Sequence, residues 1–517
     1  MDSSRLGSSY RDPSGYVFED NGRVLRAIAP QYAKHYERLM GCGLYEDLIA
    51  RDLLVMHEEL SGHPEAPGAW RVIRPVMIPV ITYPYEWCFS QLKDAALLTL
   101  DVMRVALDHG MILKDASAYN VQFVDCRPVF IDTLSFEAMD APEAWAGYRQ
   151  FCEQFLLPLA LAAYLGPETS LILRSYVDGI PLGLGSRILP RRSLLDPTLL
   201  MHVHMHALAQ ESFAQRGTAE RVGRRPSFRG LLALVESLEA GVRRLKLPAG
   251  RSAWSEYYSD TNYSASAMAS KAYVVGEMIR VAAPRNAWDI GANDARFSEI
   301  ARESGARILA IDSDWRAVDA AYQRIRREGA HGIDTIVWDL VNPSPNLGWR
   351  ESERASLPRR DGPDLVIALA VIHHICIGRN VPTASFVEWL RDSAPWAIVE
   401  FVPKEDSQTK RMLFGREDVF ADYDQSHFET AAAEHFVVER SSAVEDSLRV
   451  IYLLRRRTGP RFRSSSMDSS SAAMSGIGRG REDGARGSEG RLPQRQPPLT
   501  AAEASLEEDV TPALGAR

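Results

Sequence analysis

The sequence predicts an α/β protein whose C-terminal half carries a mostly parallel sheet. Apolar runs alternate there with helical stretches, which is typical of parallel strands joined by right-handed crossovers. A glycine turn at Gly291 follows the first run, and Asp312 closes the second run 23 residues after Asp289. Such a turn lets the backbone approach a ligand, and an acid after the second strand accepts hydrogen bonds from ribose hydroxyls. These observations predict a nucleotide pocket at the first crossover.

Five strands and a closing hairpin are expected in this half. After the first strand, which ends before Gly291, strands are predicted at Ile308–Ile311, Ile336–Leu340, Asp364–Ala370 and Ala397–Val402. The fourth is a continuous apolar run, as expected of a strand buried on both faces. Helices are predicted at Phe297–Ser304, Trp315–Glu328 and Thr383–Ser393, and the hairpin at Phe436–Arg440 and Leu448–Arg455.

The glycine turn departs from the pattern that holds dinucleotides. Counted from Gly291, Asn293 stands at the second glycine position of G-x-G-x-x-G, and neither Ala295 nor Arg296 supplies the third glycine, so a pyrophosphate has no evident cradle. A nucleoside without phosphates fits better, and S-adenosylmethionine is such a ligand. Asn and Asp tolerate the turn conformations that glycine adopts, so the departure does not by itself close the pocket.

The order of these parts resembles the class I S-adenosylmethionine-dependent methyltransferases, over roughly residues 250–456. The resemblance implies a Rossmann-like sheet, S-adenosylmethionine as cofactor and no metal in this domain. It places Asp289 and Gly291 at the methionine end of the cofactor, Asp312 at the ribose, and Asp339 with Leu340 at the adenine. The complete set of cofactor-binding residues predicted in this way is Asp289, Gly291, Asn293, Asp312, Asp339, Leu340 and Ala370. A Rossmann-like domain that binds another nucleoside, or none, is the alternative.

Four further segments resemble the family of rhizobial nodulation protein NoeA. They are Trp254–Tyr258, Thr261–Ser264, Glu400–Asp406 and Arg416–Tyr423. That resemblance implies a role in host-specific nodulation and leaves the methyl acceptor open. The acceptor expected is a small molecule or a glycan, and no feature of the sequence indicates the oligomeric state.

Three polar side chains near the predicted mouth of the pocket are candidates for a general base. His373 and His374 follow the fourth strand, and Glu400 lies in the fifth. Because histidine titrates near neutral pH, the two histidines are favoured over Glu400. In the alternative interpretation, one histidine packs under the sheet edge and has no catalytic role.

A lid over the pocket is predicted just before the first strand. Tyr258, Asn262 and Tyr263 precede a helix predicted at Ser264–Val281. Aromatic side chains at this place would cover the cofactor and shape the acceptor site. The alternative is that they pack this helix onto the sheet.

The N-terminal half contains a second, weaker pattern. Asp115, Asn120 and Asp132, with a short predicted hairpin before the last, have the spacing of a kinase catalytic loop and its metal-binding aspartate. The resemblance to protein-kinase-like folds covers about residues 16–170. It implies that these three side chains hold a nucleotide and Mg²⁺. The alternative is that Asp115 and Asn120 are ordinary turn residues.

Three parts of a kinase are missing from this half. No glycine-rich loop is found, and the strand Val24–Ile28 carries Arg26 where a phosphate-pairing lysine would stand. Thr133 and Leu134 follow Asp132 in place of Phe and Gly. A degenerate kinase-like domain used for binding is therefore favoured over one that transfers phosphate.

Length and composition predict the domain organisation. A chain of 517 residues is too long for one typical core, and its tail is too poor in apolar residues to fold. The divisions predicted are a disordered start at 1–15, an α+β, kinase-like domain at 16–215, a helical connection at 216–250, a methyltransferase domain at 251–457 and a disordered tail at 458–517.

Charge and cysteine usage narrow the class further. The net charge of −8 argues against a nucleic-acid partner, because phosphate binding needs clustered Lys and Arg. The five cysteines are scattered without C-x-x-C spacing, which indicates reduced thiols. Neither a signal peptide nor a membrane-spanning stretch is expected, so the predicted location is the cytoplasm.

Three functions are compatible with these features. The favoured one is methyl transfer from S-adenosylmethionine, with the N-terminal half recognising the acceptor. The second is a bifunctional enzyme whose N-terminal half is an ATP-dependent phosphotransferase. The third is a non-catalytic scaffold that binds S-adenosylmethionine and regulates another process.

Overall fold

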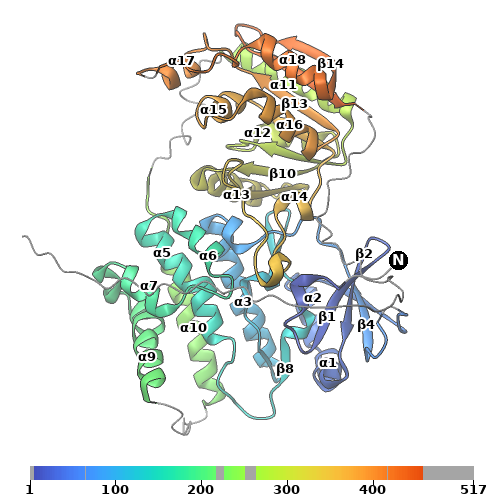
Figure 1. The fold of residues 1–517 in the computed structure, drawn as a ribbon. Helices are drawn as coiled ribbons and strands as arrows, with labels where there is room; N and C mark the ends of the chain where they lie inside the picture. Colours follow the sequence, from blue (N-terminus) through green and yellow to red (C-terminus); the bar gives the residue numbers. More distant parts are fainter. Residues whose placement is uncertain (1–4, 65, 217–225, 251–263, 416, 458–517) are drawn as a thin grey trace, which may run out of the picture. The chain divides into compact units, whose positions relative to one another are not determined.

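The C-terminal half is built on a seven-stranded sheet in the computed structural model, which describes all residues except 1–4, 65, 217–225, 251–263, 416 and 458–517 (Figure 1). Its strands are β9 (Asn286–Ile290), β10 (Arg307–Asp312), β11 (Ile333–Val337), β12 (Leu365–Ala368), β13 (Trp396–Phe401), β14 (Phe436–Ala443) and β15 (Val450–Arg456). Their order is β11-β10-β9-β12-β13-β15-β14. The first five pair in parallel, and β15 runs antiparallel to both β13 and β14. The predicted parallel strands and closing hairpin are confirmed.

Strand β9 lies at the point where the strand order reverses. Its last residue, Ile290, is paired with Ile311 of β10 on one side and with Ala368 of β12 on the other. The chain therefore leaves β9, β10 and β12 at the same edge of the sheet. Ligands of open α/β sheets bind at such a switch point, outside the carboxyl ends of the strands.

Helices cover both faces of this sheet. They are α11 (Ala265–Ala282), α12 (Arg296–Glu303), α13 (Trp315–Glu328), α14 (Leu357–Arg360), α15 (Ile372–Cys376), α16 (Thr383–Ser393), α17 (Ser407–Leu413) and α18 (Gln425–His435). Because successive strand residues point to opposite faces, Ala287 packs in the cluster that contains α11, α12 and α13, whereas Trp288 packs in the one that contains α16 and α18.

One predicted strand is shifted by three residues. The sequence predicts a strand at Ile336–Leu340, but β11 already ends at Val337. The chain turns there, because the Asp339 side chain accepts the backbone N–H of Val341 at 2.9 Å and its carbonyl accepts that of Asn342. Apolar residues continue past the end of β11 because Trp338 belongs to an apolar cluster and Leu340 packs against it.

The N-terminal half combines a small antiparallel sheet with a helical region. The elements that precede its long helix are β1 (Gly15–Asp20), β2 (Arg23–Ile28), α1 (Ala33–Gly41), α2 (Leu44–Ala50), β3 (His57–Leu60) and β4 (Arg71–Pro75), and the sheet order is β1-β2-β4-β3. Strands β1 and β2 form an antiparallel hairpin. Asn21 and Gly22 both have positive φ, as a tight hairpin turn requires.

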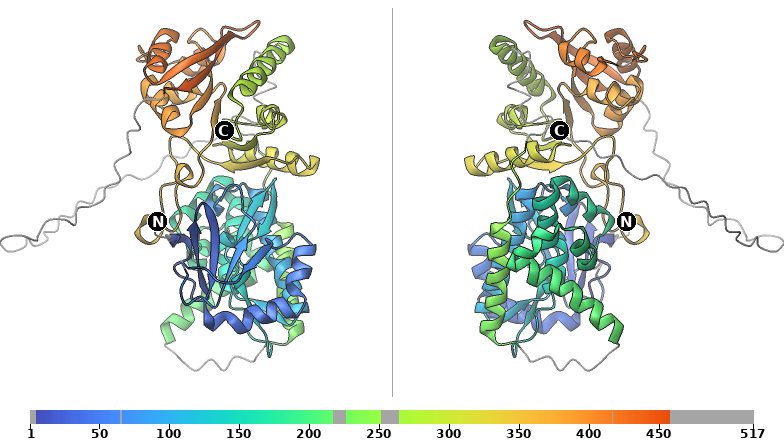
Figure 2. Two further views of the ribbon diagram at one scale, coloured as in Figure 1. Left: turned by 90° about the vertical axis from the view of Figure 1, so that its right-hand side faces the viewer. Right: turned by 90° about the vertical axis from the view of Figure 1, so that its left-hand side faces the viewer.

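Helix α3 (Phe89–Asp108) is the central element of this half (Figures 1 and 2). The small sheet lies on one side of α3 and the later helices on the other. Two two-stranded antiparallel sheets follow α3. One pairs β5 (Met111–Leu113) with β8 (Phe136–Ala138), and the other is the hairpin of β6 (Val121–Val124) and β7 (Arg127–Phe130). The later helices are α4 (Tyr148–Phe151), α5 (Leu157–Leu165), α6 (Ile172–Ser175), α7 (Leu182–Ile188), α8 (Pro197–Leu199), α9 (His206–Arg216) and α10 (Phe228–Arg244). A kinase-like identity for this arrangement stays a prediction.

The described residues between positions 5 and 457 belong to one compact unit, and both halves contribute to its core. Glu86 and Arg360 form an ion pair whose side chains are only 1% and 7% exposed. The Gln91 amide donates to the Thr335 carbonyl at 2.9 Å. Such buried polar contacts are costly to break, so the two halves are tied together. The domain boundaries given above stay predictions. Within the described ranges, no helix has the length and apolarity that crossing a bilayer requires.

Candidate functional site

A cavity of about 390 Å³ lies at the switch point of the large sheet. It opens outside the carboxyl ends of β9 to β12. The residues that line it are Lys271, Asp289, Ile290, Gly291, Ala292, Asn293, Phe297, Asp312, Ser313, Trp338, Asp339, Leu340, Val341, Leu369, Ala370, Val371, His374, Ile375, Gly378, Arg379 and Met412. All seven residues predicted to bind the cofactor are among them, although their individual roles stay predictions.

The turn after β9 is shaped to leave room for a ligand. Gly291 has φ +69°, and a Cβ placed on it would lie 2.7 Å from Cγ2 of Val371. Asn293 and Ala295 also have positive φ, at 50° and 62°. Two residues of this turn other than glycine therefore have left-handed backbone, which costs energy for Ala in particular.

The Asp312 carboxylate is fixed by the backbone around it. Oδ2 accepts the N–H of Asn293 and Oδ1 accepts that of Asp314, both at 2.9 Å. Removal of the carboxyl from bulk water raises its pKa to about 6. A carboxylate oriented in this way faces the cavity with lone pairs left for a hydroxyl donor.

The Asp289 side chain lies deeper, on β9 itself, and is only 2% exposed. It accepts a hydrogen bond from the Ser298 hydroxyl at 2.7 Å, from the first turn of α12. Burial is the main reason that its pKa is raised to about 7. The Asp289 carboxyl therefore titrates close to neutral pH.

Asp339 and Leu340 also line the cavity and lie in the turn after β11. Trp338 lies beside them, and its indole N–H is buried without a hydrogen-bond partner among the described residues. A buried donor without a partner is unusual in native proteins. Its position in the cavity wall suits an acceptor atom supplied by a ligand.

A buried ion-pair network behind the cavity was not predicted from the sequence. Lys271 of α11 lines the cavity and its Nζ lies 2.7 Å from Oε2 of Glu400, with side chains 4% and 0% exposed. Arg449 approaches the other Glu400 oxygen at 3.9 Å and bonds Asp406 at 2.8 Å. Burial lowers the pKa of Lys271, and Glu400 opposes that shift. Only a lysine at a buried position of an otherwise amphipathic helix signals this network in the sequence.

The two candidate histidines differ in position. His374 lines the cavity, whereas His373 is fully buried and does not line it. Their rings are tilted against each other, with centroids 4.0 Å apart. Among the described residues, neither ring nitrogen of His373 has a hydrogen-bond partner. Burial, with Arg449 nearby, lowers the pKa of His374 to about 4. The sequence argument for titration near neutral pH therefore does not hold for His374, and a catalytic role for either histidine stays a prediction.

The predicted lid residues Tyr258, Asn262 and Tyr263 lie outside the described residues. The helix behind them, α11, begins at Ala265. Its N-cap is Ser264, whose hydroxyl accepts the backbone N–H of Ala267 at 3.1 Å. The helix predicted at Ser264–Val281 is thereby confirmed, and the lid stays a prediction.

Asp115, Asn120 and Asp132 do come together in the N-terminal half. Asp115 is hydrogen-bonded to Asn120, and burial together with the charge of Asp132 raises its pKa. The Asp132 carboxylate, however, already has partners within the protein. It forms an ion pair with Arg26 at 2.7 Å and accepts the Ser135 hydroxyl at 2.8 Å. Arg26, which stands in place of the expected lysine, thus neutralises the charge of Asp132, the candidate metal ligand.

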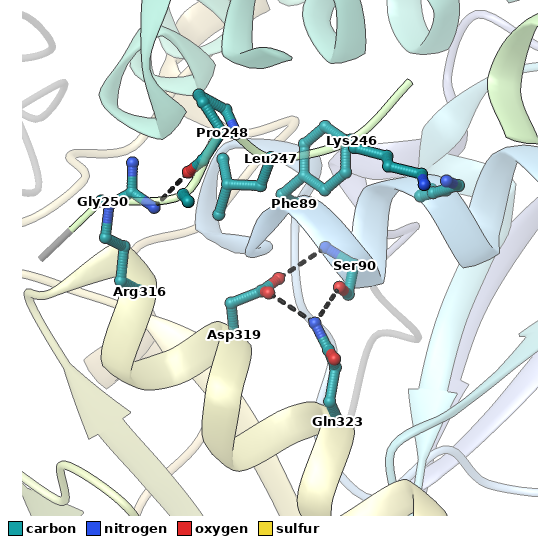
Figure 3. Close-up of a pocket in the computed structure, with 11 residues that line it drawn as sticks. Phe89, Ser90, Lys246, Leu247, Pro248, Gly250, Arg316, Asp319 and Gln323 are labelled. Atoms are coloured by element: carbon teal, nitrogen blue, oxygen red, sulfur yellow. Dashed lines mark hydrogen bonds between the residues drawn. The ribbon is translucent and has the colours of Figure 1, made fainter. Parts of the chain in front are cut away.

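A second cavity, of about 490 Å³, lies between α3 and α13 (Figure 3). Asp319 accepts the Ser90 N–H and the Gln323 amide there, both at 2.7 Å. The Lys93 ammonium donates to two carbonyls of the 243–245 segment, and the Arg316 guanidinium donates to that of Pro248. Its polar groups therefore hold the chain together, and we assign no ligand to it.

The strand order and the cavity define a protein whose C-terminal half is Rossmann-like, with a cavity at the switch point of its sheet. No model of a protein family matches the chain. Its sequence is 37% identical over 466 residues to nodulation protein NoeA of Rhizobium meliloti (strain 1021). The aligned region covers 87% of this chain and 96% of that protein. The chain therefore belongs to the family of nodulation protein NoeA, as its sequence motifs predicted.

Solved structures with a similar fold include two methyltransferases. One is the N-methyltransferase NodS from Bradyrhizobium japonicum WM9, with 13% identity over 37% of this chain and 96% of that chain, at a TM-score of 0.28. The other is the magnesium protoporphyrin IX methyltransferase ChlM from Synechocystis PCC 6803, with 17% identity over 40% and 93%, at 0.29. Because these TM-scores are low, we infer nothing further from them.

Proposed function

We propose that the chain transfers the methyl group of S-adenosylmethionine to a small-molecule or glycan acceptor. The observation that carries this proposal is the arrangement of acids around the switch-point cavity. Asp289, Asp312 and Asp339 come from three adjacent strands or the turns that follow them, and all three line one cavity. The strand order, with its antiparallel last strand, supports the same class.

The residues present fit the cofactor. Asp312 offers a fixed carboxylate to the two ribose hydroxyls, and Gly291 leaves open the space that a Cβ would fill. The buried indole N–H of Trp338 has no hydrogen-bond acceptor among the described residues and could donate to an acceptor atom of the cofactor. A cavity of about 390 Å³ falls in the range of small-molecule sites.

The protein's contribution to such a reaction is mainly placement. The cofactor supplies a methyl group already activated on a sulfonium. Asp312 and Asp339 hold the nucleoside, Asp289 lies where a positive charge needs a counter-charge, and the apolar wall of Phe297, Leu369 and Val371 excludes water. An acceptor then meets the methyl group from the side of His374 and Arg379.

Nodulation and location complete the proposal. Membership of the NoeA family supports a role in host-specific nodulation. Cys42, Cys88, Cys126, Cys152 and Cys376 are all free thiols, which supports a cytoplasmic location. The N-terminal half is proposed to recognise the acceptor, since the engagement of Asp132 by Arg26 does not favour phosphoryl transfer there.

Equilibrium dialysis with methyl-labelled S-adenosylmethionine tests the cofactor. We expect one molecule bound per chain, displaced by S-adenosylhomocysteine and not by ATP at the same concentration, because the turn after β9 lacks a phosphate cradle. Failure of a folded sample to bind the label would overturn the proposal. Displacement by ATP as effective as that by S-adenosylhomocysteine would point to another nucleotide.

A further inference from the structure

The two ends of the switch-point cavity differ in charge. The three acids that line it are Asp289 in β9, Asp312 at the end of β10 and Asp339 in the turn after β11. The opposite wall is formed by α15, the turn after it and α17, which contribute His374, Ile375, Gly378, Arg379 and Met412. None of the lining residues on this wall is acidic. If the acids hold the cofactor, the acceptor enters against this second wall.

Arg379 is the one arginine or lysine among the described residues of the acceptor wall that line the cavity. Its side chain is exposed at the mouth, and no carboxylate is recorded against its guanidinium in the described part of the chain. The other cations nearby are balanced, because Lys271 pairs with Glu400, and Arg449 pairs with Asp406. The wall therefore offers a guanidinium fork, which suits a planar or tetrahedral oxyanion.

Among the described residues of this wall that line the cavity, none is suited to take a proton. His374 lines it, but burial and Arg449 lower its pKa to about 4, far from the neutral value that general-base catalysis favours. Glu400 does not line the cavity and is held by Lys271 at 2.7 Å. A hydroxyl or ammonium acceptor would have to lose a proton here, and a developing ammonium would face Arg379.

We propose that the acceptor brings its nucleophilic oxygen as an oxyanion, either a carboxylate or a phosphate monoester, which the Arg379 guanidinium orients. An oxygen lone pair forms the new O–CH₃ bond, the S–CH₃ bond breaks, and its electron pair stays on sulfur. No proton is released, so no base is required. This inference rests on the proposed methyl-transfer function and adds the class of its acceptor.

The direct test compares four hexoses that differ in one group. Glucuronate, glucose 6-phosphate, glucose and glucosamine present a carboxylate, a phosphate, a hydroxyl and an ammonium. Each is titrated up to roughly 20 mM, as fits millimolar affinity, into the full chain saturated with S-adenosylhomocysteine, with binding followed by saturation-transfer NMR. We expect one or both anions to bind and the neutral and cationic sugars not to. Which anion binds distinguishes carboxylate from phosphate.

Three variants locate the binding. Arg379→Gln is expected to weaken anion binding at least tenfold, and Arg379→Lys less, because lysine keeps the charge and loses the fork. Arg327→Gln, an exposed arginine of α13 outside the cavity, is the matched control and is expected to change nothing. Binding of S-adenosylhomocysteine should stay within about twofold in all three, as for residues that do not touch the nucleoside.

Each other outcome has a definite meaning. Binding of glucose or glucosamine as strong as that of the anions overturns the inference, as does binding of neither anion or anion binding that Arg379→Gln leaves unchanged. Failure to bind S-adenosylhomocysteine overturns the proposed function instead. Once an acceptor fraction is found, labelled methyl groups that alkali releases as methanol identify a carboxylate, whereas label that stays on an acid-stable amine or ether overturns the oxyanion.

Discussion

Asp312 ends one strand and Asp132 comes shortly after another, and the sequence predicted both to bind ligands, yet their surroundings differ. Asp312 is held by two backbone N–H groups and faces a cavity. Asp132 is held by the Arg26 guanidinium and the Ser135 hydroxyl. The backbone orients Asp312 without cancelling its charge, whereas Arg26 cancels that of Asp132. Spacing in a sequence locates an acid, but its partners decide whether it is available to a ligand.

The largest effect is expected at the glycine turn. Gly291→Leu should weaken S-adenosylmethionine binding by more than ~100-fold, because its Cβ would meet Val371 and its side chain would enter the cavity. Calorimetry measures the loss. Gly305→Leu is the matched control, since Gly305 also has positive φ but no atom within 4 Å of its Cβ position. Equal loss in both variants would show that backbone strain, and not the cavity, causes the effect.

Breaking the buried ion pair should cost stability. Lys271→Met leaves Glu400 buried without its nearest cation, for which about 3–5 kcal/mol of unfolding free energy is typical. Urea denaturation measures the change. The double variant Lys271→Met with Glu400→Leu should recover part of the loss, because no unpaired charge is then buried. A single-variant loss below about 1 kcal/mol would contradict a desolvated pair.

Removal of the acid after β10 should weaken cofactor binding in particular. Asp312→Ala is expected to cost about 1.5–3 kcal/mol, or roughly 10–150-fold in affinity, the range for hydrogen bonds to a charged group. Asp314→Ala is the control, since it caps α13 and does not line the cavity. The control should lose about 1 kcal/mol of stability and little affinity. Loss of affinity in Asp314→Ala but not in Asp312→Ala would contradict the placement of the ribose at Asp312.

The pH dependence of binding should report the ionisation of Asp312. Its pKa is raised to about 6, so the carboxylate is ionised at pH 8 and mostly protonated at pH 5. Since the ionised form is the stronger acceptor, affinity should fall roughly tenfold from pH 8 to pH 5 through this group. Asp312→Asn should lose this part of the profile and keep the part due to Asp289. Parallel profiles for the two proteins would contradict the assignment.

The smallest effect is expected in the N-terminal half. Asp132→Ala should leave S-adenosylmethionine affinity within about twofold, because Asp132 is engaged by Arg26 and lines no part of the switch-point cavity. Calorimetry with Mg²⁺ and ATP should show no binding to the unaltered chain. Mg²⁺-dependent ATP binding that Asp132→Ala abolishes would contradict this account and favour the bifunctional alternative.

The fold of the C-terminal half follows from local patterns, which is why much of it was predictable. Periodicity alone gave the bounds of α13 and α16, and the glycine turn with its following acids indicated the cavity. The end of β11 was misplaced because apolar residues continue into a turn. A run of apolar residues does not show where hydrogen-bonding to the neighbouring strand stops.

The remaining features depend on contacts between distant parts of the chain. Lys271 and Glu400 are 129 residues apart, and only the packing of α11 beside β13 brings them together. Arg26 was identified as a substitute for a lysine, but its pairing with Asp132 depends on the tertiary fold. Likewise, the pKa of His374 depends on burial and on Arg449, which no local pattern reveals.

The central claim is that the switch-point cavity, and not the N-terminal site, binds S-adenosylmethionine. Calorimetric titration of S-adenosylmethionine into the full chain, its Asp312→Ala variant and its Asp132→Ala variant tests this most directly. The account predicts one site per chain, weakened at least tenfold by Asp312→Ala and unchanged by Asp132→Ala. No binding by the folded chain, or affinity that depends on Asp132 and not on Asp312, would contradict it.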